Sequence, residues 1–160
     1  MGLNMEISLR KAEYSDCPLI HTIQVRSFIA MLRKYEDYQS SPAAEGLDQI
    51  QRRFQQPFTS YYLITAGEQV VGILRVCDFG INCRLSPICI LPEFQGMGYG
   101  KKAVSLLETL YPKTKCWQLD TIVQEEKLCQ FYEALGFQKT GKTEHLKEQM
   151  DLVFYEKIIE

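Results

Sequence analysis

The alternation of hydrophobic and polar positions divides the chain into short predicted strands and helices. Residues 6–11 alternate in polarity as a half-buried strand does, and Ser15 or Asp16 offers an N-cap for a helix beyond it. The segment 40–42 interrupts this helical pattern, and hydrophobic residues at helical spacing from Leu47 predict a second, shorter helix that ends near Gln56-Pro57. The N-terminal third is therefore predicted to be one strand followed by two helices.

The middle of the chain predicts three strands. Two apolar runs, residues 61–64 and 70–76, flank a glycine-containing four-residue connection (66–69), which predicts an antiparallel hairpin. The next strand, predicted around residues 85–90, contains Pro87. Because proline cannot donate a ladder hydrogen bond, we expect a bulge there or a local separation from a neighbouring strand.

The C-terminal half alternates between helices and strands. After a glycine-rich turn, an apolar helical face ends at Pro112, and a further helix is predicted over about residues 125–135, closed by Gly136 as a C-cap. The remaining predicted strands lie at residues 116–122, Phe137 and 150–158. The element order β-α-α-β-β-β-α-β-α-β-β predicts a mixed α/β fold, with a mixed sheet and helices on both faces.

Composition predicts one ordinary globular domain over residues 1–160. The chain is 46% hydrophobic and 24% charged, with a formal net charge of −2 and no concentrated basic patch, so we expect no nucleic-acid partner. The N-terminus lacks the charged and apolar blocks of a signal peptide, no apolar run approaches a membrane span, and Glu6 occupies a position where myristoylation needs Ser or Thr. We expect a cytoplasmic protein without a membrane partner.

The cysteines and histidines give no indication of a metal site. None of the six cysteines forms a C-x-x-C pair, and neither His21 nor His145 lies at ligand spacing from a cysteine. Several of the cysteines fall inside apolar patterns. Buried free thiols are therefore expected, with no bound metal.

The stretch from Gln95 to Gly100 carries the clearest chemistry. It follows an apolar run at residues 85–91, contains three glycines and opens a helical pattern. A strand that passes through such a loop into a helix N-terminus directs free N–H groups and the positive end of the helix dipole at one point, which suits phosphate. Phosphate or pyrophosphate is the first ligand class to consider.

This stretch and a second segment resemble the GNAT superfamily of N-acetyltransferases. Gln95-Gly96-Met97-Gly98-Tyr99-Gly100 fits the Gln/Arg-x-x-Gly-x-Gly/Ala signature of that family, and residues 90–94 look like its apolar-x-Pro-Glu-aromatic lead-in. Residues 131–137 resemble its Tyr-x-x-x-Gly-Phe segment. The resemblance implies a mostly antiparallel sheet of about seven strands, splayed between the fourth and fifth strands.

The resemblance also implies the cofactor and the residues that would bind it. The cosubstrate would be acetyl-CoA, with its pyrophosphate on the backbone N–H groups from Gln95 to Lys101, where Lys101 could add a positive charge. We expect Gly96 and Gly98 to permit close approach and Gly100 to let the helix pack against the sheet. The splayed strand would offer backbone groups of Ile88, Cys89 and Ile90 to the pantetheine amides, and one freed N–H would stabilise the oxyanion of the transition state. In full, the candidate cofactor-binding residues are Ile88, Cys89, Ile90, Gln95, Gly96, Met97, Gly98, Tyr99, Gly100 and Lys101.

Catalytic roles follow in the same way from the resemblance. Tyr132 is the candidate general acid that would protonate the departing thiolate, and Glu36 and Asp37 are weak candidates for the base or for attracting a cationic amine. Glu93 is a weaker candidate still. No histidine lies near Cys89 in sequence to activate it, so we expect direct transfer rather than an acetyl-cysteine.

Two positions depart from the family pattern. Upstream of residues 131–137 the family commonly has Asn and then Ala, whereas this chain has Glu125 and Leu128. The departure puts one amide contact to the cofactor in doubt but not the fold.

The function that the resemblance implies is acetyl transfer to a primary amine, with a small-molecule acceptor and a possible homodimer. Two alternatives within the same fold are a protein that binds acetyl-CoA without catalysis and an N-terminal acetyltransferase of proteins or peptides. Residues 136–143 also match the G-x-x-x-x-G-K-[ST] pattern of NTPases, but a helix precedes them and a strand follows, which is the wrong context. Asp78-Phe79-Gly80 spells a kinase triplet but has the pattern of a turn.

Overall fold

The computed structural model describes residues 5–160 and contains one seven-stranded sheet with the strand order β1-β2-β3-β4-β5-β7-β6. Only β4 and β5 run parallel, and every other neighbouring pair is antiparallel. The predicted mixed, mostly antiparallel sheet is therefore confirmed. The strands are β1 (Ile7–Lys11), β2 (Thr59–Ala66), β3 (Gln69–Asp78), β4 (Asn82–Ile90), β5 (Cys116–Ile122), β6 (Gln138–Lys147) and β7 (Met150–Ile158).

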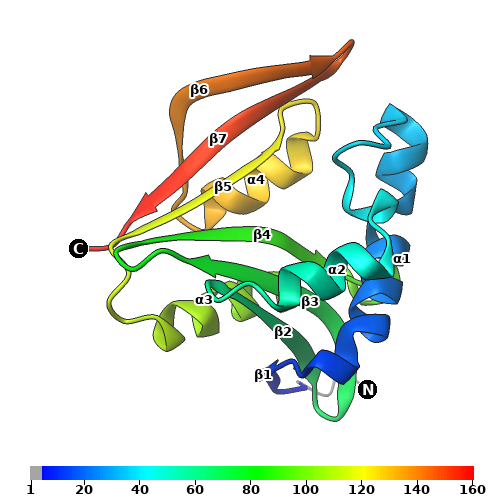
Figure 1. The fold of residues 1–160 in the computed structure, drawn as a ribbon. Helices are drawn as coiled ribbons and strands as arrows, with labels where there is room; N and C mark the ends of the chain where they lie inside the picture. The colour runs from blue at the N-terminus through cyan, green and yellow to red at the C-terminus, as the bar shows by residue number, and fades with distance from the viewer. Residues whose placement is uncertain (1–4) are drawn as a thin grey trace.

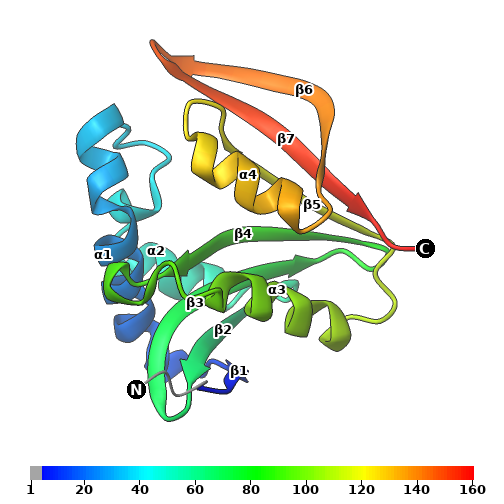
Figure 2. The ribbon, with the colours of Figure 1, turned by 180° about the vertical axis from the view of Figure 1, so that it is seen from behind.

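Helices cover both faces of the sheet, as predicted. In Figure 1, α1 and α2 lie in front of the sheet, and Figure 2 shows α3 and α4 on the opposite face. Short 3-10 turns lie between the regular elements. The helices are α1 (Cys17–Tyr35), α2 (Leu47–Phe54), α3 (Tyr99–Leu110) and α4 (Glu126–Ala134).

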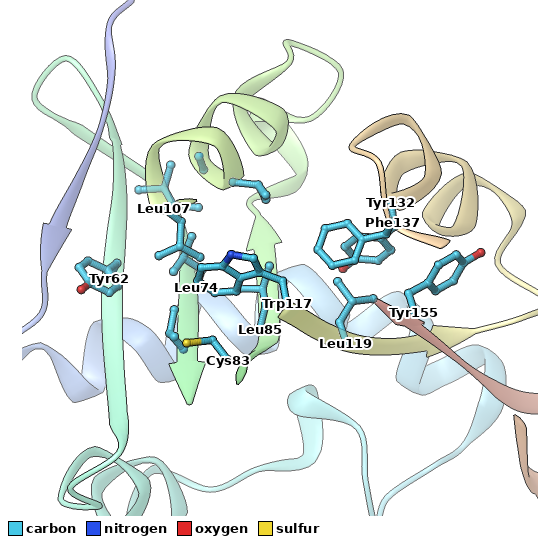
Figure 3. Packing of buried hydrophobic residues seen from close by; sticks show 14 of the residues in the cluster. Tyr62, Leu74, Cys83, Leu85, Leu107, Trp117, Leu119, Tyr132, Phe137 and Tyr155 are labelled. Carbon is cyan, nitrogen blue, oxygen red and sulfur yellow. The ribbon is translucent and has the colours of Figure 1, made fainter. Parts of the chain in front are cut away.

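The alternation along the central strands explains the two hydrophobic layers. In β2, Tyr61 and Leu63 pack in the cluster beneath α1 and α2, whereas Tyr62 and Ile64 pack in the cluster on the other face. Successive side chains of a strand point to opposite faces, so both faces of this strand are buried. Figure 3 shows part of the second layer, with Trp117 of β5 among its central side chains.

The parallel pair of strands separates soon after it begins. β4 and β5 pair only where Asn82 to Arg84 lie beside Cys116 to Gln118, and beyond these residues they diverge (Figures 1 and 2). On the other side of β4, the register with β3 shifts between Leu74 and Val76. The irregularity expected at Pro87 and the splay between the fourth and fifth strands are both confirmed.

Two predicted boundaries were wrong. Ala66 and Gln69 pair with each other, so the β2–β3 turn has two residues rather than four. β6 extends over Gln138–Lys147 rather than lying at Phe137. Nearly all of its residues are exposed. A strand exposed on both faces carries no hydrophobic alternation to reveal it.

The helices and the cysteines bear on membrane insertion and on thiol chemistry. None of the helices within residues 5–160 has both the length and the apolar content needed to cross a membrane. All six cysteines are buried as free thiols, which confirms the expectation from their spacing.

Candidate active site

A cavity of about 710 Å³ lies along β4 where β5 has moved away. Its walls come from α1, β4, the glycine-rich turn, the start of α3, and α4. Met97 does not line it and is 54% exposed. The cavity brings together the other sequence-predicted cofactor residues and the candidate acid, namely Ile88, Cys89, Ile90, Gln95, Gly96, Gly98, Tyr99, Gly100, Lys101 and Tyr132.

The glycines of the turn serve two different needs. Gly96 and Gly98 have φ values of 81° and 80°, and a Cβ at either position would meet no atom within 4 Å. These two positions therefore need glycine for the left-handed backbone, and the space beside them is open. A Cβ on Gly100 would lie 3.0 Å from Cζ of Phe131, so Gly100 allows α3 to approach α4 rather than chiefly the sheet.

Free N–H groups are concentrated at the start of α3. The first helical bond runs from the N–H of Lys102 to the carbonyl of Gly98, so the N–H groups of Tyr99, Gly100 and Lys101 have no acceptor within the helix. No acidic residue lies in this first turn. The N–H of Gln95, which was also expected to be free, instead donates to the carbonyl of Pro92 at 3.3 Å.

The edge of β4 that faces the opening offers backbone groups of alternate residues. The N–H of Leu91 donates to Val71 of β3 at 2.8 Å, so alternation directs the N–H and C=O of Ile88 and Ile90 to the open edge. The side-chain amide of Gln95 confirms this direction, because its Nε2 donates to the carbonyl of Ile90 at 3.0 Å. By the same alternation the backbone of Cys89 faces β3, which corrects the expectation that Cys89 would offer free groups. Burial also raises the pKa of the Cys89 thiol to about 12, which disfavours a nucleophilic thiolate.

Tyr132 stands on α4 across the cavity from β4. It is only 8% exposed, and its ring packs in T-shaped contacts against Phe131 and Phe137, with centroid separations of 5.1 and 6.0 Å. Figure 3 shows Tyr132 beside Phe137. Burial, aided by the negative charge of Asp120, raises the pKa of Tyr132 above its usual value. The hydroxyl is therefore protonated at neutral pH, as a proton donor must be.

A second cavity of about 400 Å³ adjoins the first. Five residues line both cavities, and we refer to the region where these residues lie as the passage. The second cavity continues toward the segment after α1, the end of α2 and the middle of the sheet. The shared residues are Phe28, Met31, Ile88, Leu128 and Tyr132.

The acidic residues singled out from the sequence lie in different places. Asp37 lines the second cavity, and its Oδ1 accepts a hydrogen bond from the N–H of Ser40 at 3.2 Å. Glu36 lines neither cavity and ends α1 in a left-handed conformation. Glu93 also lines neither and binds Arg26 through both carboxylate oxygens, at 2.8 and 2.7 Å. Of the three, only Asp37 lines either cavity.

An ion pair that the sequence did not reveal borders the first cavity. Nζ of Lys34 at the end of α1 lies 2.7 Å from Oε2 of Glu125, which also accepts a hydrogen bond from the hydroxyl of Tyr35. Burial alone would raise the pKa of Glu125, but these hydrogen bonds hold it below its usual range. Helical periodicity places Lys34 on α1, but no sequence pattern relates it to a residue near α4.

The competing motifs are not arranged as their patterns require. Gly136 follows α4, and residues 138–147 form the exposed strand β6 instead of a phosphate-binding loop followed by a helix. Nζ of Lys142 lies 4.4 Å from the ring centroid of Phe154. Gly80 donates its N–H to Oδ1 of Asp78 at 2.9 Å, as in a simple turn. These segments give no support to nucleotide chemistry.

A sequence model described as the acetyltransferase (GNAT) family matches residues 20–137, well over half of the chain. The chain belongs to this family. Among curated proteins, an uncharacterized acetyltransferase of Streptococcus pyogenes serotype M1 is 34% identical over 84 residues, which is 52% of this chain and 58% of that relative. This GNAT family member thus aligns with just over half the length of the curated relatives it matches.

Solved structures of the family share its fold. The ribosomal-protein-S18-alanine N-acetyltransferase of Escherichia coli has a TM-score of 0.77 at 14% identity, covering 96% of this chain and 94% of that one. The spermidine N-acetyltransferase of Vibrio cholerae in complex with CoA and spermine has a TM-score of 0.74 at 17% identity, covering 95% of both chains. At these identities the likeness concerns the fold.

Proposed function

We propose that the protein is an acetyl-CoA-dependent N-acetyltransferase that transfers the acetyl group directly to a primary amine. One observation carries the proposal: the start of α3 with its free N–H groups, the open edge of β4 at Ile88 and Ile90, and Tyr132 all line a single cavity. Membership of the acetyltransferase (GNAT) family supports the same function.

The residues of the first cavity fit acetyl-CoA. The N–H groups of Tyr99, Gly100 and Lys101 would bind the pyrophosphate at the positive end of the α3 dipole. The open space beside Gly96 and Gly98 gives the phosphates room to approach the backbone. The pantetheine amides would then pair with the open edge of β4, taking the place that the Gln95 amide occupies at the carbonyl of Ile90.

The chain supplies two groups to the chemistry. A backbone N–H of Ile88 or Ile90 would stabilise the negative charge that develops on the acetyl oxygen. The C–S bond of the thioester breaks as the C–N bond to the amine forms, and Tyr132 gives its proton to the departing sulfur. The acceptor ammonium loses two protons overall, one of which restores Tyr132 while the other passes to solvent.

The acceptor would reach the thioester from the second cavity. Tyr132 and Ile88 line the passage between the cavities, so an amine there faces the acetyl carbon. Of Glu36, Asp37 and Glu93, Asp37 alone lines this second cavity. It could accept the proton of the amine directly or through water.

Calorimetric titration with acetyl-CoA, followed by thiol release with a panel of amines and peptides, tests the proposal. We expect saturable binding of acetyl-CoA and release of the CoA thiol that depends on the amine. The product should be about 42 Da heavier than the acceptor, which is the mass added by one acetyl group. Binding without thiol release for any amine or peptide would favour a non-catalytic protein. Turnover of peptides alone would favour N-terminal acetylation.

A further inference from the structure

Three arginines line the second cavity, and one of them lacks an acidic partner. Arg53 is ion-paired with Glu45, and Arg84 with Asp120. Within residues 5–160, Arg75 forms no ion pair. The second cavity therefore holds one cationic group whose charge no neighbouring carboxylate neutralises.

The position of Arg75 is fixed by the irregular part of β4. Its Nε donates to the carbonyl of Ser86 at 2.6 Å. Across the described chain, the two terminal nitrogens of the guanidinium make no hydrogen bond. A guanidinium held at Nε still presents donors to a planar anion, and a carboxylate is the group that such donors match best.

Tyr61 provides a second unsatisfied group beside Arg75. The two residues are direct partners in the β2–β3 register, so their side chains lie on the same face of the sheet. Tyr61 is 1% exposed, and its hydroxyl has no hydrogen-bond partner among the described residues. Tyr61 does not line the second cavity, so of these two residues only Arg75 is accessible to a ligand there.

We propose that the acceptor is an amine that also carries a carboxylate, in the simplest case a free amino acid, and that Arg75 binds the carboxylate. This inference rests on the proposed function. Ser86, which fixes Arg75, is two residues from Ile88 on β4, and all three residues line the second cavity. Only one carbon separates the amine and carboxylate of an amino acid, so a carboxylate on Arg75 would keep the amine in this part of the cavity.

The remaining charges of the cavity argue against a polycationic acceptor. Glu45 and Asp120 are already paired with arginines, which leaves Asp37 among the acidic residues of the lining. A polyamine needs an excess of negative charge, which this lining does not offer. A peptide N-terminus carries an amide where an amino acid carries its carboxylate, and so leaves Arg75 unpaired.

The transfer itself leaves the carboxylate unchanged. The thioester C–S bond breaks and the amide C–N bond forms, with one proton going to the sulfur through Tyr132 and one to solvent. The carboxylate on Arg75 holds the amine in place throughout. The apolar passage residues Phe28, Met31 and Leu128 would contact an apolar side chain of the acceptor.

The test compares L-amino acids with their own carboxamides in the thiol-release assay. For the preferred side chain we expect kcat/KM at least about tenfold higher for the free acid, because the amide leaves a cavity-lining guanidinium without its charged partner. Arg75→Gln should remove that preference, so that kcat/KM for the free acid no longer exceeds kcat/KM for the carboxamide measured on the same variant. Arg75→Lys should recover part of the preference for the free acid, since the lysine ammonium keeps the positive charge but lacks the paired N–H donors of the guanidinium. The control is Arg52→Gln, because Arg52 pairs with Asp48 on the exposed surface of α2.

A second readout does not depend on turnover. N-acetylated amino acids, which have the structure of the product, are titrated into the CoA-loaded protein and into its Arg75→Gln form. Loss of this binding in Arg75→Gln, with no turnover of any amine, would support the carboxylate site and contradict the proposed function. Equal kcat/KM for acids and carboxamides in the unmutated protein, or product binding that Arg75→Gln leaves unchanged, would overturn the inference and leave the proposed function standing.

Discussion

Gly96 and Gly98 are needed for their backbone conformation, whereas Gly100 is needed for space. The first two have left-handed φ values and open surroundings, and the third faces Phe131 of α4. A signature motif can thus combine residues that are fixed for different physical reasons. Met97 is exposed and does not line the cavity.

Gly98→Ala tests the role of the turn, with Gly141→Ala as its matched control. Both glycines are left-handed with no atom within 4 Å of the added methyl group, but Gly141 lies on β6, away from both cavities. Each change should therefore lower the free energy of unfolding by about 1–2 kcal/mol. Only Gly98→Ala should weaken acetyl-CoA binding, by at least about tenfold, measured by calorimetry. Equal affinities in the two variants would show that the turn does not bind the cofactor.

Sequence reasoning at the residue scale succeeded where hydrophobic patterning decides the outcome. The buried thiols follow from apolar patterns, whereas the left-handed backbone of Gly96 and Gly98 was found only in the structure. The sequence did not predict which backbone groups would be occupied by hydrogen bonds within the protein. The N–H of Gln95 and the backbone of Cys89 were expected to be free, but a local turn occupies the first and strand alternation directs the second to β3.

At the scale of elements, β4 determines the site because it loses one neighbour and keeps the other. It leaves β5 after Arg84 but follows β3 as far as Ile90. Gly72 of β3 permits this close pairing, since a Cβ there would lie 2.2 Å from the carbonyl oxygen of Cys89. Pro87 made the irregularity predictable, because the missing N–H is a property of the residue itself.

Gly72→Ala should distort the edge that carries the site. The added methyl group would meet backbone atoms of β4, which cannot rotate away, so we expect a loss of about 1–3 kcal/mol in the free energy of unfolding. Acetyl-CoA binding should weaken as well. In Gly46→Ala the nearest atom is Oδ1 of the exposed Asp48, so the loss should stay below about 1 kcal/mol. Urea titration of both variants checks the difference, and equal losses would contradict it.

At the scale of the whole molecule, the site exists because distant segments meet at the opening between β4 and β5. The Lys34–Glu125 pair and the Arg84–Asp120 pair join residues far apart in sequence. Patterns of hydrophobic spacing predict which elements form, but they carry no information on which charged side chains meet after folding. For that reason the second cavity and Arg75 could not be predicted, although the fold and the family could.

Buried tyrosines should make the protein sensitive to alkaline pH. Burial raises the pKa of Tyr61 from 10 to about 12, and it also raises the pKa of Tyr111, Tyr132 and Tyr155. Below pH 10 these groups are neutral in both the folded and the unfolded chain. As the pH rises above 10, the unfolded chain releases protons first, so the free energy of unfolding should fall.

Tyr61→Phe isolates one of these groups. For Tyr61 the complete loss of stability, from well below pH 10 to well above pH 12, corresponds to about 3 kcal/mol, and the variant should not show this contribution. The variant should also be slightly more stable at neutral pH, because it removes a buried hydroxyl without a partner. Tyr38→Phe, at a side chain that is 68% exposed, serves as the control. An alkaline loss in Tyr61→Phe as large as in the unmutated protein would contradict the assignment.

The steady-state kinetics of Tyr132→Phe test the central claim most directly, because they separate proton donation from cofactor binding. The control is Tyr155→Phe, since Tyr155 packs near Tyr132 but binds Glu133 and lines neither cavity. We predict that Tyr132→Phe lowers kcat by at least about 100-fold while KM for acetyl-CoA stays within about twofold. An unchanged kcat would contradict the account.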